Sequence, residues 1–206
     1  MFKIIEPNIF NVDKVKYSLI DTSYIDNYKI EDEKISLNKC IRCSNTIFSK
    51  DIININNITS STFEDVIFEQ CDLSNVTFIN CNFYRVIFKN CKMLGTSFID
   101  CGFYNVKIIE SNCKLLNLSS NIFKCVLISS TNLTESNISN NKFNLLELSY
   151  VNLCNSEIVN TKLSGIDLST CNIEGIFINI NDLKDTIIRV DQAMDLINIL
   201  GVKIKE

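Results

Sequence analysis

The chain has 206 residues, with 20 basic and 24 acidic side chains and a formal net charge of −4. This length fits one domain with small appendages, and the mildly acidic balance disfavours direct nucleic-acid binding through a basic patch. The absence of histidine removes imidazole from any acid–base or metal chemistry at neutral pH. No apolar run approaches the roughly 18 residues of a membrane span, and the amino end lacks a signal-peptide core. We therefore expect a cytoplasmic protein that does not contact a membrane.

Residues 1–38 contain the only proline, Pro7, and two short strand-like stretches around a polar segment. They do not keep the phase of the repeat that follows. We expect an N-terminal cap or lead-in over the first coil, because an open solenoid end exposes its core and its strand edges. The alternative is a partly ordered tail.

From Phe48 to Ile188 every fifth residue is apolar, and among these 29 positions only Cys113 is not a large apolar side chain. A period of five is neither the 3.6 of a helix nor the 2 of a strand. The residue two places before each central residue is small or medium, as at Val66 and Cys71. Self-similarity at a fixed period indicates a repeat architecture.

Two inward residues in every five fit a chain that turns a corner at each pentapeptide. Four such sides would close a square coil of about 20 residues, and successive coils would stack at roughly 4.8 Å. Large central side chains would then fill the axis. The sequence thus predicts an all-β solenoid of about seven coils over residues 39–189.

Four stretches match the unit A(D/N)LXX of the pentapeptide-repeat proteins, at residues 71–75, 81–85, 131–135 and 151–155. The chain resembles that family over about 140 of its 206 residues. The resemblance implies a right-handed quadrilateral β-helix. Cysteine, valine, serine and threonine replace the alanine of the unit here, a variation that the family tolerates.

The ten cysteines include four that recur every ten residues, namely Cys71, Cys81, Cys91 and Cys101. In a 20-residue coil Cys71 stacks on Cys91, at a separation that leaves a disulfide open. A cytosolic setting and the apolar character of free cysteine favour reduced packing residues. Cys40 and Cys43 form the only CxxC, and without histidine we expect no metal site.

Residues 190–206 change pattern. Asp191 suits a helix N-cap, and Gly201 suits the position after a helix of about nine residues. So short a helix depends on packing, either as a cap on the last coil or in a dimer. Val202 and Ile204 alternate like a short strand that could pair with a partner.

This end resembles the C-terminal segment of Qnr-type pentapeptide-repeat proteins, in which a Gln-Ala helix ends in Leu-Gly and a short strand. The resemblance implies a homodimer. Its contact residues would be Leu196, Ile197, Leu200, Val202 and Ile204.

Nothing in the pattern favours catalysis. Carboxylates are scattered singly over outward positions, five glycines leave no phosphate-binding loop, and a filled coil leaves no cavity. We therefore expect no enzyme and no cofactor.

Function should lie in the outward columns of the coil. Ile67 and Ile87 share one apolar column, which is either a binding stripe, a surface covered by the amino-terminal segment, or a consequence of strand propensity. Acidic side chains cluster in one coil at Glu64, Asp65, Glu69 and Asp72, opposed by basic residues in the next.

The Qnr resemblance implies a DNA-mimicking rod that binds DNA gyrase or topoisomerase IV and protects it from quinolones, through that acidic cluster. Residues 41–188 carry 14 acidic and 11 basic side chains, which is a poor imitation of a polyanion. A rigid interaction scaffold with an unidentified protein partner is the alternative, because a fold alone does not define a function.

Overall fold

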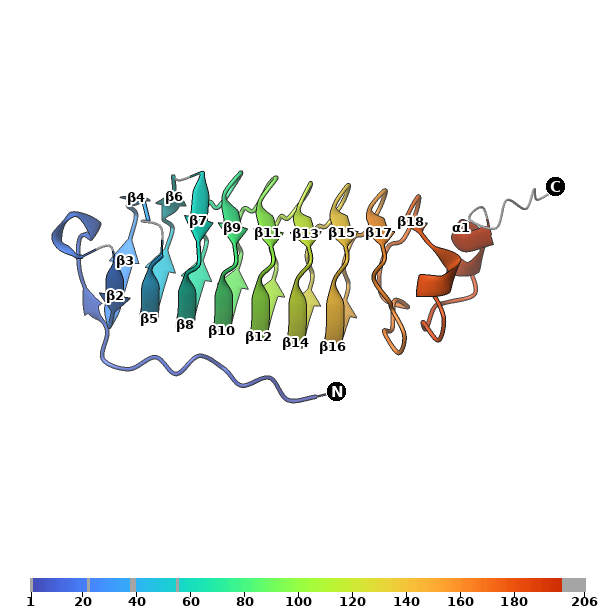
Figure 1. Ribbon diagram of the computed structural model, residues 1–206, viewed down its shortest axis with the longest axis horizontal. Coiled ribbons are helices and arrows are strands. Elements are labelled where there is room, and N and C mark those ends of the chain that lie inside the picture. Colours follow the sequence, from blue (N-terminus) through green and yellow to red (C-terminus); the bar gives the residue numbers. More distant parts are fainter. Residues whose placement is uncertain (1, 22, 38–39, 55, 198–206) are drawn as a thin grey trace.

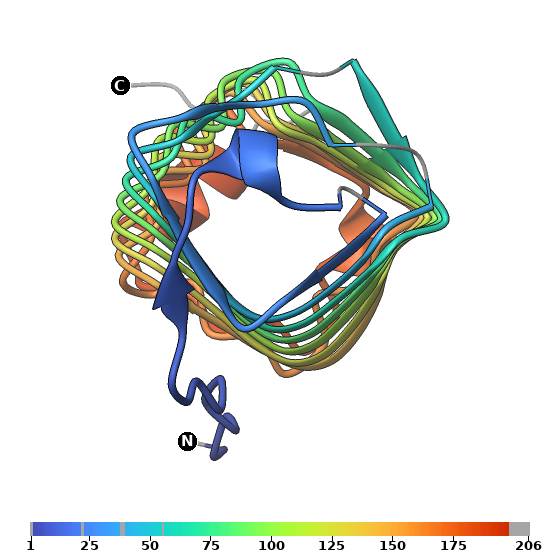
Figure 2. The ribbon, with the colours of Figure 1, turned by 90° about the vertical axis from the view of Figure 1, so that its left-hand side faces the viewer.

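The computed structural model describes residues 2–21, 23–37, 40–54 and 56–197. These residues form a right-handed, all-β parallel solenoid of about eight turns with one short C-terminal helix (Figure 1). Viewed along its axis, the chain traces a four-sided coil (Figure 2). The predicted quadrilateral β-helix is confirmed.

Long strands form two adjacent sides of the coil and bend at the corner between them. They are β5 (Arg42–Ser49), β8 (Thr62–Glu69), β10 (Asn82–Lys89), β12 (Gly102–Ile109), β14 (Ile122–Ser129) and β16 (Lys142–Ser149). Neighbours pair in parallel with a 20-residue offset, so that Phe63 lies against Phe83 and Phe83 against Phe103. Each central residue therefore stacks on its counterpart one coil away.

Short strands form one of the two remaining sides of the coil. They are β7 (Asn57–Thr59), β9 (Thr77–Ile79), β11 (Ser97–Ile99), β13 (Asn117–Ser119), β15 (Asn137–Ser139), β17 (Glu157–Val159) and β18 (Phe177–Ile178). The remaining side is held by single parallel bridges, such as Asp72 with Lys92.

The lead-in contains a coil of its own. Its strands are β1 (Asp13–Lys14), β2 (Tyr24–Asp26), β3 (Tyr28–Glu31) and β4 (Lys34–Ile35), which pairs with β6 (Ile52–Ile53). Ile25 pairs with Cys43 and Ile30 with Phe48, an offset of 18 residues instead of 20. Buried isoleucines at 25, 30 and 35 keep the five-residue period, shifted by two residues from the main repeat. Because of that shift, the sequence pattern did not indicate a coil within residues 1–38.

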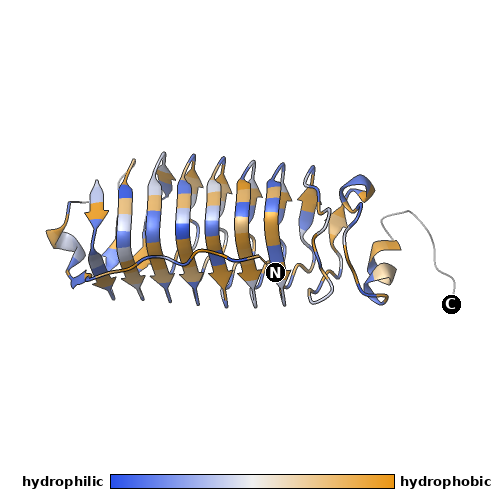
Figure 3. Ribbon diagram, turned by 90° about the horizontal axis from the view of Figure 1, so that it is seen from below, coloured by the Kyte–Doolittle hydropathy of each residue, from blue (hydrophilic) through white to orange (hydrophobic). Residues whose placement is uncertain are grey.

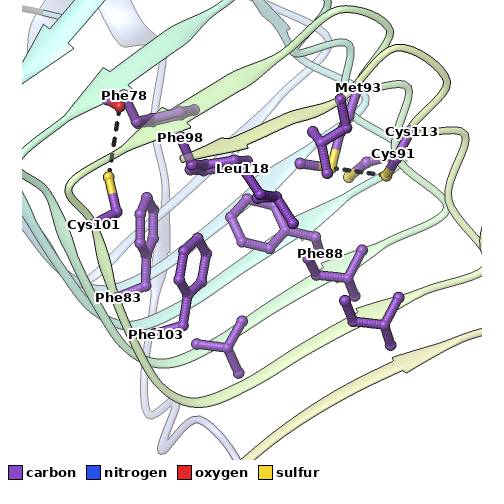
Figure 4. Close-up of a cluster of buried hydrophobic side chains, with 14 of the residues drawn as sticks. Phe78, Phe83, Phe88, Cys91, Met93, Phe98, Cys101, Phe103, Cys113 and Leu118 are labelled. Atoms are coloured by element: carbon purple, nitrogen blue, oxygen red, sulfur yellow. Dashed lines mark hydrogen bonds between the residues drawn. The ribbon is translucent and has the colours of Figure 1, made fainter. Parts of the chain in front are cut away.

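The axis is filled by stacked aromatic rings. Phe48 stacks on Phe68 and Phe68 on Phe88, with ring centroids 4.9 and 5.0 Å apart. A second stack runs from Phe63 through Phe83 and Phe103, and Figure 4 shows Phe83 and Phe103 within it. Parallel in-register strands impose this geometry, because identical positions repeat at the strand spacing.

Polar inward residues reach the backbone of the preceding coil. The Asn121 Nδ2 donates to the Phe98 carbonyl at 3.0 Å, and the Cys101 Sγ donates to the Phe78 carbonyl at 3.5 Å (Figure 4). The ten cysteines are free thiols. Burial raises the pKa of the Cys43 thiol, which keeps it protonated and able to donate.

Helix α1 (Gln192–Ile197) closes the C-terminal end after a 3₁₀ turn at Ile180–Asp182. The buried Gln192 Nε2 donates to the carbonyls of Leu168 and Cys171, at 2.9 and 2.8 Å. At the other end, Tyr17 lies in a 3₁₀ turn and donates through its hydroxyl to the Ser36 carbonyl. The described residues contain no helix long and apolar enough to cross a membrane.

Candidate interaction surface

Basic residues one coil further along pair with all four acidic residues of the predicted cluster. Arg85 contacts Glu64 at 2.8 Å and Asp65 at 2.7 Å. The other two pairs are Lys89 with Glu69, at 3.1 Å, and Lys92 with Asp72, at 2.9 Å. Burial raises the pKa of Asp65, but the hydrogen bonds from Arg85 and from the Asn8 N–H outweigh it and lower that pKa below its usual value. The cluster is therefore largely neutralised within the rod.

The apolar column lies beside these pairs. Ile67 and Ile87 are in register on β8 and β10, point outward and are half-buried. Glu64, Asp65 and Glu69 lie on the same strand as Ile67, whereas Asp72 lies past the next corner. The structure thus brings five of the six predicted surface residues together and separates Asp72 from them.

The N-terminal residues 2–10, which we call the strap, run along the outside of the rod (Figures 1 and 3). Strap N–H groups donate to corner side chains of three coils: Phe10 to Asn45 (2.9 Å), Asn8 to Asp65 (2.8 Å) and Ile5 to Asn105 (3.1 Å). Glu6 pairs with Lys107, which interrupts the apolar column. Residues 2–10 thus lie beside the long strands and not over the first coil. Sequence reasoning offered a covering segment as one alternative, but nothing in it indicated the corner acceptors that hold the strap.

The wall of the rod opens after β16. Among the described residues no strand pairs with the outer edge of β16, although the short-strand side continues in register from β17 to β18. The Ser130 N–H donates to the Ser149 carbonyl one coil on, at 2.9 Å, whereas the Tyr150 N–H reaches the Thr170 hydroxyl, at 3.1 Å. Figure 1 shows the next coil standing apart from β16 on that side.

Residues 161–170 pair forward instead of back. The N–H groups of Leu163 and Gly165 donate to the carbonyls of Asp182 and Asp185, at 2.9 and 3.0 Å. These residues form turns where the earlier coils form a bent strand. Because residues 161–170 form turns and pair with the following coil, their backbone does not pair with β16 on the two sides that the long strands form.

The opening exposes part of the core. Phe143, Leu146 and Leu148 are only half-buried, whereas Phe123 and Val126, one coil earlier, have no exposed surface. A cleft of about 330 Å³ lies there. It is lined by Phe2, Leu146, Glu147, Leu148, Ser149, Gly165, Asp167 and Thr170. The five-residue period continues through Leu163 and Leu168, so nothing in the hydropathy pattern indicated this cleft.

Charge is uneven along the rod. Residues 141–197 carry eight acidic and four basic side chains, whereas residues 1–140 carry 15 acidic and 14 basic ones. Glu147 and Asp167, on either side of the cleft, make no ion pair with another described residue. The acidic excess therefore lies in the C-terminal coils, and two of its carboxylates, Glu147 and Asp167, line the cleft.

The residues predicted for dimerisation are only partly described. Leu196 and Ile197 lie on α1, and Leu196 packs against the core of the last coil. Leu200, Val202 and Ile204 lie outside the described residues. The predicted homodimer stays a prediction.

Residues 61–107 match a family model described as a pentapeptide repeat region. This match and the five-residue register seen throughout the coil show that residues 61–107 form a pentapeptide repeat region within a coil of the same repeat. No curated protein matches the chain.

Among solved structures, the chain is similar to full-length QnrB1, a plasmid-mediated fluoroquinolone resistance protein, at 18% identity. The match covers 92% of this chain and 95% of that one, with a TM-score of 0.42. It is also similar to a pentapeptide repeat protein of the Arabidopsis thaliana thylakoid lumen, at 17% identity over 62% of this chain and 72% of that one, with a TM-score of 0.32.

Proposed function

We propose that this chain is a non-enzymatic interaction protein, a rigid rod that binds a protein partner through its outward side chains. The observation that carries the proposal is the filled interior, in which central residues from Ile25 to Phe123 are buried. Such an interior leaves no room for a substrate, and the described residues bring no three His, Cys, Asp or Glu together as a metal site. A stiff repeated surface suits recognition better than chemistry.

Site-specific photo-crosslinking tests this role. A benzophenone side chain is placed on each side of the rod, at Lys124, Glu147, Asn112 and Asn137 in turn, and adducts are resolved by mass spectrometry. We expect one partner to crosslink from one side or two adjacent sides, because a rod presents one face at a time. Absence of adducts from every side, or indiscriminate adducts from all four, would contradict the proposal.

A type II topoisomerase is the second candidate partner, favoured by the acidic excess in residues 141–197. Carboxylates there could take the place of DNA phosphates at basic residues of gyrase or topoisomerase IV, with binding that weakens as salt rises. The paired cluster at Glu64, Asp65, Glu69 and Asp72 has little charge left for this purpose.

A gyrase supercoiling assay with ciprofloxacin tests this candidate. We expect protection or inhibition by the wild-type protein, lost on charge reversal at Glu157 and Glu174 and retained when Glu64 and Asp65 become amides. If supercoiling is unchanged at micromolar protein, with and without the drug, this partner should be abandoned.

The chain is also proposed to form a homodimer through its C-terminal segment. Support comes from the amphipathic pattern at Leu196, Ile197 and Leu200, followed by alternating Val202 and Ile204. Because Leu196 already packs on the last coil, the residues beyond α1 would carry most of the contact.

A further inference from the structure

We propose that the open edge of β16 is a docking site for an extended segment of a partner protein, which adds to the sheet as a parallel strand. The inference rests on the proposed interaction role and gives it a site and a partner chemistry. The segment carries a basic residue between two apolar residues.

The first argument is the free strand edge. A strand edge presents unpaired N–H and C=O groups that another chain can complete. β16 pairs with β14 along its inner edge, from Lys142 to Ser149, while no described strand lies on its outer edge. It is thus an eight-residue template within the wall of the rod.

The second argument is the exposed core beside that edge. In a strand added to β16, side chains alternate between the interior and solvent. Inward ones would meet Leu146 and Leu148, which are half-buried, and would restore the burial that Val126 and Ile128 have one coil earlier. Apolar residues two apart are therefore required.

The third argument is charge. The outward residue between those two apolar ones would lie between Glu147 and Asp167, which occupy equivalent positions one coil apart and line the cleft. Lysine or arginine there would meet two carboxylates, in the acidic third of the rod. β12 already contains this pattern as Val106, Lys107 and Ile108, so the coil accommodates it.

The strap supplies a fourth observation. Phe2 lines the cleft, which shows that an apolar side chain from an extended segment can lie against this opening. Residues 198–206, outside the described part, contain Val202, Lys203 and Ile204 and are the competing occupant.

Fluorescence anisotropy with a labelled peptide tests the site. The probe has the sequence of residues 102–110, and its matched control replaces the lysine at 107 by glutamate. We expect the probe to bind the full chain and to slow amide hydrogen exchange over residues 143–148. A variant carrying Glu147→Lys and Asp167→Lys should bind the probe about tenfold more weakly. The glutamate peptide should prefer that variant over the wild type.

A charge-matched variant, with Glu157→Lys and Glu174→Lys on other sides of the rod, should bind the probe as the wild type does. A chain shortened to residues 1–197 distinguishes the occupants. If the probe binds the shortened chain but not the full one, the C-terminal residues fill the cleft and a partner segment is excluded.

The inference is also overturned if the probe binds neither the full nor the shortened chain, or if its affinity is unchanged by the Glu147→Lys and Asp167→Lys substitutions. One-sided photo-crosslinks in the absence of peptide binding would leave the interaction role standing and remove only this site.

Discussion

Left-handed corner residues make the square coil possible. Nearly every fifth residue between Lys50 and Asp185 has a positive φ, for example 60° at Asn75 and 55° at Asn155. Asparagine, aspartate and glycine tolerate this conformation, whereas other residues cost roughly 1–2 kcal/mol. The sequence showed only that these positions are mostly polar. Its five-residue period locates them, but a backbone dihedral is not visible in a hydropathy pattern.

Leu115 is a costly corner. It has a φ of 60° and is 48% exposed, so its side chain gains little from burial. Leu115→Asn should stabilise the protein by about 0.5–1 kcal/mol and raise Tm by about 1–4 °C. Thermal unfolding followed by circular dichroism measures this. Ile122→Asn, at an equally exposed strand position, should give no gain, and a matching gain there would refute the corner explanation.

Asp51 is another residue whose position follows from the five-residue period but whose protonation does not. It occupies an inward position, is fully buried and accepts N–H groups from Glu33 and Ser49, at 2.8 and 3.0 Å. Burial raises its pKa from 3.8 to about 6 despite those hydrogen bonds. The folded chain therefore binds this proton more tightly than the unfolded chain does.

The sign of the pH dependence follows. The stabilisation from protonated Asp51 is complete below the unfolded pKa near 3.8 and is lost as the pH rises through about 6. Asp51→Asn should remove this pH-dependent loss, but its amide NH2 cannot accept the second N–H group, so the gain in stability at pH 7 should fall short of the roughly 3 kcal/mol of the full pKa shift. Urea unfolding between about pH 4 and 7 measures it, with the exposed Asp100→Asn as control. Equal pH slopes for wild type and Asp51→Asn would contradict the assignment.

At the scale of elements, the stacked phenylalanines link neighbouring coils. Phe83 lies between Phe63 and Phe103, with both centroid distances at 5.1 Å, and it has no exposed surface. Phe83→Ala should destabilise the rod by about 3–5 kcal/mol, because coils that remain stacked on their other sides cannot collapse into the space. Phe83→Leu should cost markedly less. Urea denaturation tests the order of the two, and equal losses would argue against a cavity.

The same scale shows why the five-residue period predicted so much of the fold and missed the cleft. Central residues specify which side chain points inward, so strands β5 to β16 and their 20-residue register follow from the sequence. Leu163 and Leu168 keep that phase and are buried, yet the backbone around Gly165 forms turns and pairs with the following coil. The five-residue hydrophobic period therefore predicts which side chains are buried, but not whether the backbone between them forms a bent strand or a turn.

Over the whole molecule, the net charge of −4 hides a difference between two regions: residues 1–140 are nearly balanced, whereas residues 141–197 are acidic. The acidic cluster of residues 64–72 is paired with basic residues about 20 positions further along the chain, for example Glu64 and Asp65 with Arg85. The later coils keep an acidic excess, of which Glu147 and Asp167 lie beside the opening at β16. The sequence exposed the first cluster because its residues are contiguous, whereas Glu147 and Asp167 become neighbours only in the folded coil.

The oligomeric state belongs to this scale as well. Leu196 packs on the last coil, so Leu196→Asp should loosen the C-terminal cap and lower Tm whether or not a dimer forms. Leu200→Asp should instead convert a dimer to a monomer and leave the Tm of the monomeric rod nearly unchanged, if residues beyond α1 carry the contact. Sedimentation velocity gives the mass and circular dichroism the Tm. A wild-type monomer, or a dimer indifferent to Leu200→Asp, would rule out association through Leu200, because an aspartate buried in a small apolar interface without a partner costs more than such an interface supplies.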